Sequence, residues 1–144
     1  MPDSLSELVQ LIQLSVAPVF LLTGVAGFLS VMTQRLARVI DRTRALEAAA
    51  TEASVPDPRA NAELRTLRGR MNLINRAISL CTISALLVAS VIASIFLGAL
   101  FGFHLAPVVA GTFVVAMLLL IGGLVNFLGE VHLATRFVRT DAQR

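Results

Sequence analysis

Lysine, tryptophan and tyrosine are absent from this chain of 144 residues, and cysteine occurs once. A lone cysteine, Cys81, excludes an intramolecular disulfide and argues against a metal cluster. Its position inside an apolar run is typical of a small packing residue. The sequence also has no nucleophile beside a base, no glycine-rich phosphate loop and no paired metal-ligand motif. We therefore expect no enzymatic activity, no cofactor and no metal.

Basic residues are missing from two long stretches of the chain. All 12 arginines lie either between Arg35 and Arg76 or between Arg136 and Arg144. The net charge of +3 and the pI near 11 would suit a nucleic-acid binder. These arginines, however, are mixed with acidic residues and lack the interleaved aromatic residues of a base-stacking surface. We therefore expect anionic lipid headgroups as their partners, and no nucleic acid.

Apolar residues are in excess. They make up 56% of the chain, and the mean hydropathy of +0.82 is higher than a soluble core requires. Three apolar runs are each long enough, as helices, to cross roughly 30 Å of hydrocarbon. The sequence thus predicts an all-α integral membrane protein, a bundle of three transmembrane helices at residues 8–33, 74–103 and 107–129.

The distribution of arginine predicts the orientation of these helices. If the amino terminus is outside, every arginine lies on the cytoplasmic side, where basic residues accumulate in membrane proteins. Residues 1–7 then form an external arm, 104–106 an external turn and 130–144 a cytoplasmic tail. Asp3 and Glu7, with no basic residue beside them, make a poor start for a cleavable signal, so we expect the first span to be retained.

Residues 34–73 predict a cytoplasmic antiparallel helical hairpin that extends from the first two spans. No glycine or proline interrupts the chain after Thr33, and Pro56 and Pro58 predict a turn near 54–59. Both arms carry apolar residues at spacings of about three and four, which gives each arm one apolar face. The alternative is a solvated linker without helical packing. The apolar positions are Leu36, Val39, Ile40, Leu46 and Ala50, then Leu64, Leu67, Met71, Ile74 and Ile78.

Small residues recur along two of the predicted spans. The second span has one every four residues, a spacing that lets membrane helices approach closely. We interpret both sets as packing faces, either within the chain or between subunits. These candidate packing residues are Gly24 and Gly27 in the first span, and Ser90, Ser94, Gly98 and Gly102, the small-residue ladder, in the second.

Charged residues gather where the spans meet the cytoplasm. Arg38 and Arg44 each lie three residues from Asp41, close enough on a helix to share its carboxylate. One interpretation is headgroup anchoring with weak surface pairs. The other is a selectivity or gating collar in an oligomer, because one copy of three helices encloses no pore. The candidate charged collar comprises Arg35, Arg38, Asp41, Arg42, Arg76 and Glu130.

Glu130 ends the third span and shares a helix face with Asn126, Gly123, Ala116 and Thr112. A carboxylate at the edge of the hydrocarbon is costly unless it is paired, so we expect Glu130 to pair with Arg76 or Arg35. This pair could fix the register of the helices. Alternatively, the polar stripe of Asn126 and Thr112 could mark a path for ions or protons.

Three stretches carry a family resemblance that covers nearly the whole chain. They are Arg-Leu-Ala-Arg-Val-Ile-Asp-Arg at 35–42, Arg-Gly-Arg-Met-Asn-Leu-Ile-Asn-Arg-Ala-Ile at 68–78, and Phe-Leu-Gly-Glu-Val at 127–131. In this order they resemble the bacterial membrane family called domain of unknown function 2721. The resemblance implies a small bacterial inner-membrane protein with three spans, and it implies no activity.

Two hypotheses for function remain after these exclusions. The first is a homo-oligomer with a central path for ions or small solutes, lined by the small residues and ringed by the candidate charged collar. The second is a structural or accessory membrane subunit, whose cytoplasmic hairpin docks a partner protein. A transporter with its own binding site ranks third, because the sequence contains no visible inverted repeat or broken helix.

Overall fold

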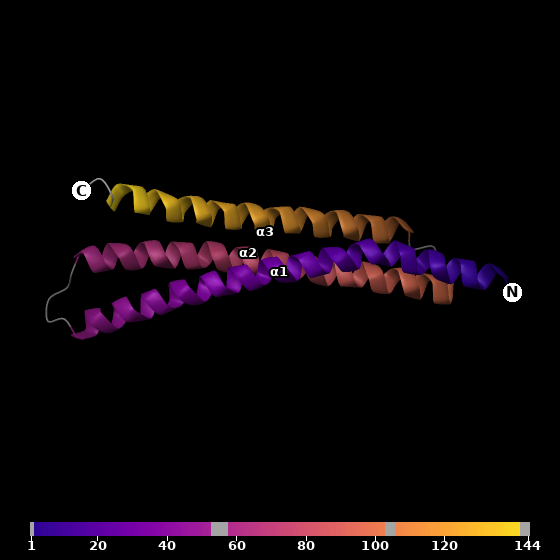
Figure 1. Cartoon of the computed structure of the whole chain (residues 1–144), viewed down its shortest axis with the longest axis horizontal. Coiled ribbons are helices and arrows are strands. Elements are labelled where there is room, and N and C mark those ends of the chain that lie inside the picture. Colours follow the sequence, from indigo (N-terminus) through magenta and orange to yellow (C-terminus); the bar gives the residue numbers. More distant parts are fainter. Residues whose placement is uncertain (1, 53–57, 103–105, 142–144) are drawn as a thin grey trace. The chain divides into compact units, whose positions relative to one another are not determined.

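The computed structural model describes residues 2–52, 58–102 and 106–141. These residues form three helices, α1 (Pro2–Glu52), α2 (Pro58–Phe101) and α3 (Ala106–Asp141) (Figure 1). No strand occurs in the described ranges. The all-helical class expected from the sequence is therefore confirmed.

Each helix contains a segment long and apolar enough to cross a membrane: Leu8–Thr51, Pro58–Phe101 and Ala106–His132. All three segments overlap the spans expected from the sequence. Pro58 opens α2 at a position where its missing N–H costs nothing. Gly102 follows the last residue of α2 with φ of +70°, a left-handed conformation that glycine adopts without strain. The rest of the two connections, 53–57 and 103–105, lies outside the described residues, and so do Pro56 and His104.

The helices contribute to two compact units. The apolar unit consists of Met1–Leu29 and Leu80–Ile121, and the charged unit consists of Ser30–Ser79 and Gly122–Arg144. Every arginine, aspartate and glutamate whose side chain is described belongs to the charged unit. The two units therefore differ in chemistry.

Buried residues follow a seven-residue spacing on every helix. From Ile74 to Val91 on α2 the buried positions alternate in steps of three and four, and their exposed fractions are 0–3%. This spacing of 3.5 residues is that of a coiled-coil seam, where apolar side chains stay on the contact side of the helix. We call these positions the seam. It comprises Pro18, Val25, Met32 and Val39 on α1, Ile74, Ala77, Cys81, Ser84, Val88 and Val91 on α2, and Ala116, Gly123 and Glu130 on α3.

In the apolar unit, α2 and α3 approach each other through small seam residues. The Ser84 hydroxyl donates a hydrogen bond of 2.7 Å to the backbone carbonyl of Ala116, and both residues are fully buried. Side chains of this size allow the backbones to come close, which is how helices gain contact in lipid. The lone cysteine, Cys81, lies one step along the same seam and is buried, as a packing residue should be.

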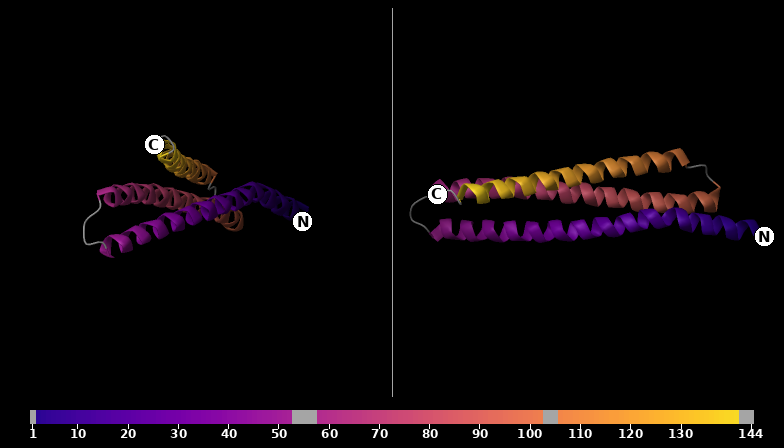
Figure 2. Two further views of the ribbon diagram at one scale, coloured as in Figure 1. Left: turned by 60° about the vertical axis from the view of Figure 1, so that its left-hand side comes forward. Right: turned by 45° about the horizontal axis from the view of Figure 1, so that its top comes forward.

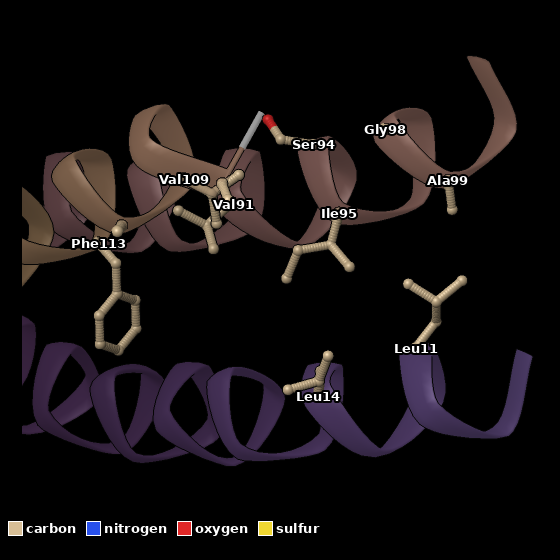
Figure 3. Close-up of a pocket in the computed structure, with 11 residues that line it drawn as sticks. Leu11, Leu14, Val91, Ser94, Ile95, Gly98, Ala99, Val109 and Phe113 are labelled. Carbon is tan, nitrogen blue, oxygen red and sulfur yellow. The ribbon is translucent and has the colours of Figure 1, made fainter. Parts of the chain in front are cut away.

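An open apolar groove of about 560 Å³ also lies in the apolar unit. Leu11 and Leu14 of α1 point toward Ile95 and Ala99 of α2 across it, and Phe113 of α3 lies at one side (Figure 3). Its lining includes Ser94 and Gly98, two members of the small-residue ladder.

The remaining candidate packing residues are not covered by other parts of the described chain. Ser90, Gly102, Gly24 and Gly27 are exposed. A Cβ added at Gly24, Gly27 or Gly102 would meet nothing within 4 Å. The close approach within the chain therefore uses Cys81, Ser84 and Ala116, and the two ends of the ladder, Ser90 and Gly102, stay uncovered by this chain.

In the charged unit, residues 30–52 of α1 run beside residues 58–79 of α2 (Figure 2). Of the ten apolar positions expected on the two arms, four are buried, five are half-buried and Ala50 is exposed. The half-buried ones are Leu36, Ile40, Leu46, Met71 and Ile78, and the buried ones are Val39, Leu64, Leu67 and Ile74. Thr43 joins them, because its hydroxyl donates a 2.8 Å hydrogen bond to the carbonyl of Val39 and needs no water.

Candidate functional site

The strongest candidate site is a buried carboxylate held by two arginines, all within the charged unit. Glu130 of α3 has an exposed fraction of 0%. Its Oε2 accepts a 3.0 Å bond from Nη1 of Arg35 on α1. Its Oε1 accepts two bonds from Arg70 on α2, 2.7 Å from Nη2 and 3.2 Å from Nε. One carboxylate thus joins all three helices, and we call this arrangement the Glu130 clamp.

The clamp satisfies the main requirement for burying a charge. A buried carboxylate costs several kcal/mol unless it is both paired and hydrogen-bonded, and here both oxygens have charged donors. Among the described residues, every buried side-chain nitrogen or oxygen has a hydrogen-bond partner. The two arginines keep part of their side chains in contact with solvent, 35% for Arg35 and 25% for Arg70. The clamp carries one surplus positive charge, because two guanidinium groups face one carboxylate.

The seam explains why these residues meet. Glu130 occupies a seam position on α3, seven residues after Gly123. Arg70 precedes Ile74 by four residues and Ala77 by seven, so it continues the seam of α2 in the direction of the turn. The guanidinium of Arg35 also lies over the ring of Phe127, 5.4 Å from its centroid, a cation–π contact that fixes its orientation.

Two further ion pairs connect α1 and α2 in the charged unit. Arg42 lies 2.8 Å from Glu63, and Arg68 lies 3.2 Å from Glu47. All four side chains are exposed by more than two fifths, so each pair contributes well under about 1 kcal/mol. They nevertheless restrict how α1 and α2 lie in this unit, because they connect the two helices at two points.

The structure brings together only part of the candidate charged collar. The expected pairing of Glu130 with Arg35 is present, whereas the second partner is Arg70, which was not among the expected ones. Arg76 is exposed, and no carboxylate of a described residue lies within 4 Å of it. Arg38 and Asp41 are exposed and likewise form no ion pair within the described part of the chain, so the expected sharing of Asp41 by Arg38 and Arg44 is absent there.

The candidate polar stripe on α3 is satisfied within its own helix. The Asn126 amide donates a 2.8 Å hydrogen bond to the carbonyl of Gly122, and the Thr112 hydroxyl donates one of 2.8 Å to the carbonyl of Val108. These local bonds occupy the hydroxyl donor of Thr112 and one amide donor of Asn126. On the same face of α3, the Glu130 side chain reaches two other helices.

A carboxylate between two arginines connects the helices that carry them and leaves one positive charge that can attract an anion. In the described ranges, no group of three or more histidine, cysteine, aspartate or glutamate residues is arranged to hold a metal. The arrangement defines a class of protein: a three-helix protein fit to cross a membrane several times, in which the charged side chains that the structure describes lie in one unit.

Comparison with known proteins narrows this class to a family. The chain belongs to the family described as "Protein of unknown function (DUF2721)", whose model matches residues 15–140. The match includes all three residues of the Glu130 clamp and confirms the resemblance seen in the sequence. No curated protein and no solved structure matches the chain.

Proposed function

We propose that this chain is an accessory or structural subunit of the bacterial inner membrane, and that its charged unit forms a cytoplasmic antiparallel hairpin that docks a partner protein. The observation that carries the proposal is that the charged residues divide into two sets. One set pairs within the chain and holds the helices together. The other set is exposed and has no oppositely charged partner in the described part of the chain, namely Arg38, Asp41, Arg44, Arg65 and Arg76.

The ion pairs between α1 and α2 support the reversal of direction that a hairpin requires. Arg42 lies ten residues before the end of α1, and Glu63 lies five residues after the start of α2. If both helices continued in one direction, 15 residues at about 1.5 Å each would separate these two positions by more than roughly 20 Å. The contact of 2.8 Å between them favours two arms that fold back on each other.

The distribution of arginine along the chain supports a cytoplasmic location for the hairpin. No basic residue occurs before Arg35 or between Arg76 and Arg136, so one orientation places all of them inside. To test this, Cys81→Ala is combined with Ala48→Cys in the charged unit, and spheroplasts are treated with a membrane-impermeant maleimide. We expect labelling only after permeabilisation, whereas Leu5→Cys in the same background should label in intact spheroplasts. Labelling of Ala48→Cys from outside would exclude the cytoplasmic hairpin.

A homo-oligomeric channel is the second candidate. Two observations favour it: the exposed small residues Gly24, Gly27 and Ser90 offer a face to a second copy, and Arg38 and Asp41 are free to surround an axis in an oligomer. The accessory subunit accounts for more of the charged residues than the channel does, because Glu130 and Arg42 of the candidate charged collar are already paired within one copy. Anionic lipids at the cytoplasmic face are partners in both.

One purification separates the two candidates. Arg44→Ala combined with Arg65→Ala removes two exposed charges and no ion pair, and Gln13→Ala is a matched exposed substitution in the apolar unit. We expect a bound protein to co-purify with the wild type and with Gln13→Ala, and its recovery with the double variant to fall about tenfold. Protein freed of partners should conduct no ions in liposomes. Ion flux that persists in the double variant would favour the channel instead.

A further inference from the structure

A second cavity of about 270 Å³ lies in the charged unit beside the Glu130 clamp. Four of the six residues that line it are arginines: Arg35, Arg38 and Arg42 from α1, and Arg70 from α2. Val39 and Leu67 of the packed stripes complete the wall. The cavity is partly open, and its volume exceeds that of several waters, each about 30 Å³ in the liquid. We call this cavity the arginine pocket.

The arginine pocket is positively charged even after its ion pairs are counted. Glu130 neutralises one of the two positive charges that Arg35 and Arg70 carry, and Glu63 neutralises the charge of Arg42. Four guanidinium groups against two carboxylates leave two positive charges. Within the described part of the chain, Arg38 has no carboxylate within 4 Å, and its one hydrogen bond is a weak one of 3.5 Å from Nε to the backbone carbonyl of Gln34.

Hydrogen-bond donors also remain available in the pocket. A guanidinium group carries five N–H donors. Arg35 gives one of its donors to Glu130, and Arg70 gives two, from Nε and Nη2. Because the clamp holds both side chains in place, their remaining N–H groups are fixed before any ligand arrives, which reduces the entropy cost of binding.

We propose that the arginine pocket binds a phosphate group. Guanidinium groups match phosphate oxygens with paired N–H donors, and several of them around one cavity with a surplus positive charge select an anion. The apolar run of α1 ends at Met32, so Arg35 and Arg38 follow it by one to two turns, a level at which phospholipid headgroups occur. Either an anionic phospholipid or a free phosphate can supply the group. The proposal does not depend on a docked protein or on a channel.

The test uses the full-length protein in a nonionic detergent and isothermal titration. The probes are a short-chain phosphatidylglycerol, a short-chain phosphatidylcholine of equal chain length, and inorganic phosphate. Arg38→Gln is the test variant, because it removes a pocket donor without breaking an ion pair. Arg44→Gln is the control, because it removes the same charge from an exposed position outside the pocket.

We expect phosphatidylglycerol to bind the wild type, and its affinity to fall about tenfold in Arg38→Gln and to stay unchanged in Arg44→Gln. Phosphatidylcholine, whose phosphate is balanced by its own cation, should bind more weakly. If inorganic phosphate alone shows the dependence on Arg38, the pocket holds a soluble phosphate and the proposal stands. Equal affinity in wild type and Arg38→Gln for every probe, or an equal fall in Arg44→Gln, would overturn it.

Discussion

Glu130→Gln is expected to lower the free energy of unfolding by about 3 kcal/mol, the lower end of the range for breaking a buried ion pair. The substitution keeps the shape of the side chain but leaves Arg35 and Arg70 facing each other without a counter-charge. The cost stays at the lower end because both arginines remain partly exposed, so water compensates them in part. Denaturant unfolding in detergent, followed by circular dichroism, measures the change.

Glu63→Gln provides the matched control for this prediction. It removes the same charge from the same unit, but Glu63 and its partner Arg42 are 42% and 57% exposed. Its cost should stay below about 1 kcal/mol. Replacing the whole clamp by Arg35→Met, Arg70→Met and Glu130→Leu should recover most of the lost stability, since apolar groups need no counter-charge. Equal costs for Glu130→Gln and Glu63→Gln would show that the clamp does not hold the helices.

Ile74→Ala is expected to have the second largest effect, a loss of about 2–3 kcal/mol. Ile74 is fully buried on the seam of α2, and shortening its side chain leaves a cavity that the surrounding helices fill only in part. The same unfolding experiment measures this loss.

Leu86→Ala on the same helix is the appropriate comparison. The Leu86 side chain is 63% exposed within the chain, so its removal should cost little stability in a protein whose surface faces detergent. If the two substitutions cost the same, packing against the other helices would not distinguish the seam from the outer face of α2.

Much of the helical framework was predictable because its signals are local. The length of the apolar runs and the absence of breakers after Thr33 depend only on neighbouring residues, and α1 accordingly runs unbroken to Glu52. The apolar face around Leu64, Leu67 and Ile74 was also visible, because helical periodicity fixes which side chains share a face. The side of the membrane on which these arms lie stays a prediction.

The partners of Glu130 were harder to predict because they depend on the register between helices. Arg76 and Arg70 are both near the end of the second span, and sequence distance does not distinguish them. The seven-residue spacing distinguishes them, because Arg70 continues the series of Ile74 and Ala77, whereas Arg76 lies beside the seam. Extending the seam backward along α2 would therefore have selected Arg70.

The small-residue ladder illustrates a different difficulty. A repeat of four residues from Ser90 to Gly102 is conspicuous in the sequence, but Ser90 and Gly102 are exposed in the chain. The close contact forms instead at Ser84, in a seam with alternating steps of three and four. A stripe of small side chains indicates where a helix can be approached, and it does not identify which helix, or which copy, approaches.

The seven-residue spacing also restricts how proteins of this kind can change in length. On α1 it continues from Pro18 through Met32 to Val39, from the apolar unit into the charged one, without a skipped step. Deleting one residue after Met32 would turn the following part of the helix by about 100° and carry Arg35 away from Glu130. Insertions that preserve the phase come in blocks of seven, about 10 Å of helix each. Relatives with longer or shorter arms should therefore differ by whole heptads.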